Sequence, residues 1–74
     1  MSKRDEFISE LADALEVSSY LLVPSADLQA LDWDSLAIIS TIAIADSIYN
    51  VMLTGQDLQN AKSFGDILGL LPDL

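Results

Sequence analysis

The first hydrophobic pattern along the chain predicts an amphipathic helix over residues 3–16. Ser2 precedes it and can accept a hydrogen bond from a first-turn amide, so it is the expected N-cap. Asp5 and Glu6 follow, and acidic side chains are favourable at the positive end of the helix dipole. The apolar positions recur at spacings of three and four residues, namely Ile8, Leu11, Ala12 and Leu15.

A longer apolar pattern predicts a second helix over residues 35–50. The positions expected to face the core are Ile38, Ile42, Ala45 and Tyr49. The opposite face carries Leu36, Ser40, Ala43, Ser47 and Asn50. The connection before this helix, residues 17–34, is long for so small a protein, and we expect it to pack its own side chains. The candidates are Leu21, Leu22, Leu28, Leu31 and Trp33.

Two further helices are predicted near the end of the chain. Thr54 can cap a short helix over residues 56–61, and Ser63 with Asp66 resembles a capping box that opens a last helix. Pro72 prevents that helix from extending. The sequence therefore predicts an all-α bundle of three main helices and one short helix, in a single domain over residues 1–74.

The composition of the 74-residue chain excludes several classes of function. It contains no cysteine and no histidine, so it lacks thiolate metal ligands and the commonest general base, and we do not expect an enzyme. The net charge of −9 disfavours nucleic acid and anionic membranes and favours partners with basic patches. The N-terminus is unlike a secretory signal, and the apolar run over residues 36–45 is too short to span a bilayer. We expect a cytoplasmic monomer that does not insert into membranes.

The candidate chemistry lies in the stretch "LDWDSLAIIS", residues 31–40. Asp34 or Ser35 is well placed to cap the second helix, and that role alone would explain both residues. Serine needs an activating base to act as a nucleophile, and the chain has no histidine to provide one. If Ser35 reacts, another protein must activate it.

Asp34-Ser35-Leu36, together with the length, the acidity and the helix order, resembles the acyl carrier protein family over essentially the whole chain. The apolar stripe that starts at Ile38 and the Ser-Phe pair before the last helix also fall where the family has counterparts. The resemblance implies an acyl-carrier-like four-helix bundle. It implies that a phosphopantetheinyl transferase attaches 4'-phosphopantetheine from coenzyme A to Ser35, with Mg²⁺ that Asp34 could help to orient. Acyl groups would then be held on the arm as thioesters and exchanged with acyl-loading and acyl-transferring enzymes.

The second helix departs from the family pattern. Common fatty-acid carriers bear several glutamates on its exposed side, whereas this helix has one carboxylate, Asp46. We therefore expect an apolar partner contact, with Asp32, Asp34 and Asp46 as secondary guides. The contact residues would be Leu36, Ile39, Ala43 and Asp46.

Several alternatives remain open at this point. Ile39 and Ile44 could instead pack under the long connection, and Trp33 could simply cover the core. Ala43 and Ala45 could leave room for an acyl chain or only allow close helix packing. The pathway could be fatty-acid-like or specialised, as in polyketide, secondary-metabolite or surface-glycan synthesis. The cargo could also be an aminoacyl or D-alanyl group, or the chain could be an unmodified acidic helical adaptor.

Overall fold

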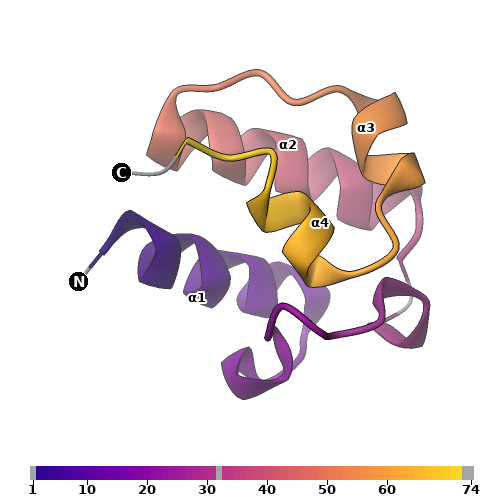
Figure 1. Cartoon of the computed structure of the whole chain (residues 1–74). Helices are drawn as coiled ribbons and strands as arrows, with labels where there is room; N and C mark the ends of the chain where they lie inside the picture. The colour runs from indigo at the N-terminus through magenta and orange to yellow at the C-terminus, as the bar shows by residue number, and fades with distance from the viewer. Residues whose placement is uncertain (1, 32, 73–74) are drawn as a thin grey trace.

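The computed structural model describes residues 2–31 and 33–72, and within them the chain is all-α, as predicted. Figure 1 shows α1 and α2 side by side in opposite directions, with α4 packed across them. The part of the chain described contains no β-strand, only an isolated bridge between Asp27 and Ser63. The elements in chain order are α1 (Lys3–Leu15), the 3-10 turns η1 (Ser19–Leu21) and η2 (Leu28–Leu31), α2 (Ser35–Tyr49), α3 (Gly55–Asn60) and α4 (Phe64–Leu68).

Helix α1 begins and ends through local backbone chemistry. The Ser2 hydroxyl accepts a hydrogen bond from the Asp5 amide at 3.1 Å, which confirms the predicted cap. Glu16 adopts a left-handed conformation with φ of 59°, and this ends the helix one residue earlier than predicted. The buried side chains are Phe7, Leu11 and Ala12, with Ile8 and Leu15 half-buried beside them. Phe7 is a core residue that the predicted pattern omitted.

The buried face of α2 is rotated from the predicted stripe. Its buried residues are Ala37, Thr41, Ala45 and Tyr49. Ile38 and Ile42, expected at the centre of this face, are half-buried on its flank. Small side chains along the contact line let α2 approach α1 closely, and these two helices share the most extensive contact in the fold. The Thr41 hydroxyl donates to the Ala37 carbonyl at 2.8 Å, so its burial leaves no unpaired polar group.

The connection from α1 to α2 packs against the core, as expected. Leu22 and Leu28 are buried, and Leu31 is half-buried, but Leu21 is exposed and the prediction was wrong for it. The half-buried Trp33 covers part of the core, and its Nε1–H donates to the Leu58 carbonyl of α3 at 3.0 Å. The end of this connection is thereby tied to the third helix just before α2 begins.

The two C-terminal helices are both short, so the bundle has two long helices rather than the three main helices predicted. The Thr54 hydroxyl accepts from the Asp57 amide at 3.1 Å and caps α3 as predicted, although α3 starts one residue early. The predicted capping box of Ser63 and Asp66 opens α4. This helix ends at Leu68, because the chain continues in tight turns, with Leu70 and Leu71 bonding to carbonyls three residues back.

The fold clearly lowers the pKa of the exposed Asp66 carboxyl. Backbone N–H groups of Lys62 and Ser63 donate to its carboxylate at 2.9 and 3.2 Å and hold its pKa below the usual value. The ionised form therefore stabilises the folded state. This contribution is present above the ordinary aspartate pKa and is lost as the pH falls through the lowered folded-state pKa.

We expect Asp66→Asn to lower the melting temperature at neutral pH, because an amide accepts these backbone bonds more weakly than a carboxylate. The difference from the unaltered chain should shrink in acid, where Asp66 itself is protonated. Melting curves at neutral pH and well below the carboxyl range measure this. Asp57→Asn on α3 removes the same charge and serves as the control; equal effects of both variants at neutral pH would contradict the capping account.

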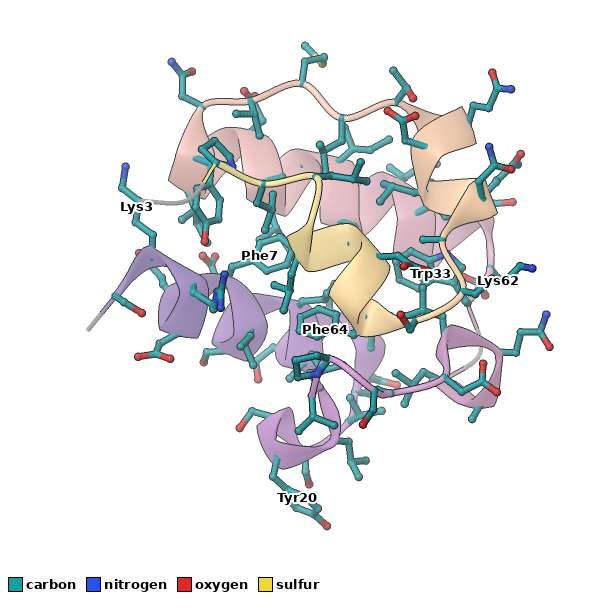
Figure 2. All side chains as sticks on the ribbon, viewed as in Figure 1. Lys3, Phe7, Tyr20, Trp33, Lys62 and Phe64 are labelled. Carbon is teal, nitrogen blue, oxygen red and sulfur yellow. The ribbon has the colours of Figure 1, made fainter. Side chains whose placement is uncertain are left out.

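Aromatic side chains join the helices at the centre of the core. The Phe7 ring lies edge-on to Tyr49 of α2, with centroids 6.1 Å apart, and stacks with Phe64 of α4 at 6.3 Å. Figure 2 shows Phe7 and Phe64 between α1 and α4, whereas Tyr20 points away from the fold. All three rings of this cluster are buried, so it connects α1, α2 and α4.

Gly65 allows α4 to lie directly on the α1–α2 connection. Its N–H donates to the Pro24 carbonyl at 2.9 Å, and a Cβ at this position would lie 2.9 Å from the same oxygen. A methyl group there would therefore push the two segments apart. At Gly69 a Cβ would meet only ordinary contacts, the nearest at 3.5 Å.

We expect Gly65→Ala to destabilise the chain by about 1–3 kcal/mol through overpacking. Gly69→Ala is the matched control, and its change should stay within about 0.5 kcal/mol or be stabilising. Urea denaturation of both variants measures the difference. A Gly65→Ala variant as stable as Gly69→Ala would show that α4 does not contact Pro24 closely.

Among the described residues, no helix is both long enough and apolar enough to cross a membrane.

A candidate modification site at the start of α2

Ser35 is the first residue of α2, and its side chain is exposed. Asp34, in an extended conformation, is the N-cap, and its carboxylate accepts a hydrogen bond from the Ala37 amide at 2.9 Å. The structure thus decides between the two predicted caps in favour of Asp34. Because Asp34 performs the capping, the Ser35 hydroxyl is not needed for it.

The first turn of α2 is a favourable place for an anion. The amides of Ser35 and Leu36 precede the first intrahelical hydrogen bond, which runs from the Ile38 N–H to the Asp34 carbonyl at 3.0 Å. Free amides and the positive end of the helix dipole both favour a negatively charged group here. The local geometry therefore suits a phosphodiester on the Ser35 oxygen.

The four expected partner-contact residues share one exposed side of α2. We call this the α2 strip: Leu36, Ile39, Ala43 and Asp46. Leu36 and Ile39 keep 71% and 62% of their surface exposed, which is high for large apolar side chains. Ile39 is exposed, so it does not pack under the connection, whereas Ile44 is half-buried against the core. Asp32, expected as a secondary guide, lies outside the described residues.

A pocket on the other side of Leu36 was not foreseen from the sequence. This α1–α2 pocket has a volume of about 130 Å³ and is open to solvent. It is lined by Ala14 and Leu15 of α1, Leu31 of η2, and Asp34, Leu36, Ala37 and Ser40. No sequence signal marks it, because its walls come from three elements that only the fold brings together.

No three metal-binding side chains gather within the part of the chain that the structure describes. Asp34 lies directly before Ser35 at the start of α2. Comparison with known protein families, with curated proteins and with solved structures finds no match to this chain.

Proposed function

We propose that this chain is an acyl carrier protein that holds acyl groups as thioesters on a 4'-phosphopantetheine arm attached to Ser35. The observation that carries the proposal is an exposed serine at the first position of the longest helix, with its neighbour Asp34 providing the cap. The Asp-Ser-Leu sequence, the acidity and four helices in one small fold add support. The proposed architecture is correspondingly an acyl-carrier-like bundle.

The attachment step requires an exposed hydroxyl and a second protein. In a phosphopantetheinyl transferase complex, the Ser35 oxygen would form a bond to the β-phosphorus of coenzyme A, and adenosine 3',5'-bisphosphate would leave. A base on the transferase would take the serine proton, because this chain has no histidine. Asp34 would contribute one carboxylate ligand to Mg²⁺, which in proteins typically binds one or two carboxylates together with phosphate oxygens.

The attached 4'-phosphopantetheine arm would then supply the thiol chemistry that the chain lacks. Its terminal thiol holds the acyl group, so the absence of cysteine from the sequence is compatible with thioester carriage. The protein's part is to present Ser35 and to be recognised by loading and transferring enzymes. The exposed α2 strip next to Ser35 favours recognition through an apolar contact.

The same site would also serve an aminoacyl or D-alanyl carrier, and the α2 strip alone would serve an unmodified adaptor. Intact-mass analysis after incubation with coenzyme A, Mg²⁺ and a broad-specificity transferase separates carriers from the adaptor. A carrier gains one phosphopantetheinyl unit, whereas an adaptor keeps its original mass. The cargo is then read from the mass of the chain isolated with its natural thioester.

Docking of the transferase should depend more on Leu36 than on Asp46. Truncation of a central apolar anchor can cost more than about 1 kcal/mol, whereas exposed ion pairs contribute about 0.2–1 kcal/mol. We therefore expect Leu36→Ala to lower the kcat/KM of loading more than fivefold and Asp46→Ala less than fivefold, as these energies imply at about 1.4 kcal/mol per factor of ten.

Loading rates of both variants at low and moderate salt measure this difference. The Leu36→Ala defect should persist as salt rises, because apolar contacts are not screened. A larger defect for Asp46→Ala that disappears with salt would instead indicate docking through charge.

A further inference from the structure

The α1–α2 pocket has room for one large apolar side chain, and its wall is partly apolar and partly polar. Apart from Asp34 and Ser40, all of its lining residues are apolar. Its volume of about 130 Å³ is close to that of an engineered 150 Å³ cavity known to hold one benzene molecule. A leucine, methionine or phenylalanine side chain is a group of this size. Leu36 forms one wall and remains 71% exposed, so a group in the pocket would cover it.

Acidic side chains lie in the wall of the pocket and one helical turn away from it on α1. Asp34 lies in its wall, and Glu10 is exposed on α1 one turn before Ala14, on the same side of the helix. The chain has only three cations. Lys3 and Arg4 lie at the opposite end of α1, about 16 Å from Ala14 at the helical rise per residue. Lys62, in the connection between α3 and α4, lies closer, because its carbonyl accepts a hydrogen bond from the Leu28 N–H of η2 at 3.1 Å (Figure 2).

We infer that the α1–α2 pocket docks a segment of a basic partner protein, which inserts one large apolar side chain flanked by lysine or arginine. The apolar side chain fills the space beside Ala14, Leu31 and Leu36, and the cation lies near Asp34 and Glu10. A second copy of this chain is a poor occupant, because its net charge of −9 would be repelled. The inference extends recognition from α2 to α1 and η2 and does not depend on modification of Ser35.

Peptide selection on the 74-residue chain tests this inference. We would immobilise the chain carrying Ser35→Ala, so that no arm contributes, and select from a random displayed peptide library. The expected peptides carry Leu, Met or Phe next to Lys or Arg. Titration of the strongest peptide into ¹⁵N-labelled chain should shift the amide signals of Ala14, Leu31 and Ser40 most.

Variants of the pocket give the quantitative test. Ala14→Leu fills the pocket from α1 and should weaken peptide binding by about tenfold or more, as loss of an anchor site does. Ser9→Leu adds the same side chain to another exposed side of α1 and should leave binding unchanged. Glu10→Gln should weaken binding by about 1.5- to 5-fold at low salt, and this loss should vanish at high salt.

Several results would overturn the inference. Equal peptide affinity of Ala14→Leu and the parent chain would show that the pocket is not used. Selected peptides that lack cations would contradict a basic partner. Amide shifts centred on the exposed Tyr20 or Met52 would place peptide binding elsewhere, and self-association through Leu36 would make a second copy the occupant. The carrier proposal is tested separately, by the mass gain at Ser35 of the unaltered chain. Failure of that test would not affect the peptide-binding result, and failure of peptide binding would not affect the carrier proposal.

Discussion

Replacing Phe7 with alanine is expected to lower the free energy of unfolding by about 3–5 kcal/mol. Phe7 is fully buried, and its ring contacts both Tyr49 and Phe64, so its loss leaves a cavity where α1, α2 and α4 meet. A domain has about 5–15 kcal/mol of stability in total, and one this small buries less surface than most. The substitution should therefore leave the fold marginal, with a melting temperature about 12 °C or more below that of the parent chain.

Urea denaturation followed by far-ultraviolet circular dichroism measures the loss. Phe7→Leu retains most of the apolar volume and should lose clearly less unfolding free energy. This variant keeps the comparison informative if Phe7→Ala does not fold. Tyr20→Ala is the surface control, because Tyr20 is 77% exposed, and its change should stay within about 0.5 kcal/mol. Similar losses for Phe7→Ala and Tyr20→Ala would contradict the placement of the aromatic cluster.

Replacing Ser35 with alanine is expected to abolish phosphopantetheinylation while leaving the fold intact. The loss should be complete, because the hydroxyl oxygen is the atom that forms the new bond. Stability should change by no more than about 0.5 kcal/mol, since Asp34 retains the cap and alanine is the best helix former.

Ser47→Ala is the matched control for this prediction, because Ser47 is also exposed on α2. It should be loaded at the parent rate. Loading is measured by intact mass, and the fold by thermal melting of the same samples. Residual loading of Ser35→Ala would place the modification elsewhere, whereas a large fall in its melting temperature would mean that Ser35, not Asp34, holds the helix start.

The helix starts were predictable because each cap is a local event. Ser2, Thr54 and Ser63 each bond an amide three residues ahead, so a short stretch of sequence contains both partners. The start of α2 was equally local, although only the structure assigned the cap to Asp34. Helical spacing also placed Leu36 and Ala43 opposite the predicted core face, and both are exposed, whereas the exposure of Ile39 was left open by the sequence.

The rotation of α2 could not be read from periodicity, because apolar residues occur on every side of the helix. With isoleucines on several sides, the buried line is set by how closely α1 approaches, and that favours Ala37, Thr41 and Ala45. Phe7 was missed although its spacing of four from Leu11 was a usable signal. The α1–α2 pocket depends on how α1, η2 and α2 meet, which no local pattern encodes.

The most direct measurement of the central claim is the intact mass of the unaltered chain after incubation with coenzyme A, Mg²⁺ and a broad-specificity phosphopantetheinyl transferase, followed by fragmentation to locate any added mass. The carrier account predicts a gain of one phosphopantetheinyl unit on the fragment that contains Ser35. An unchanged mass, under conditions in which a known carrier is fully loaded, would contradict the account, as would a unit attached to any other serine.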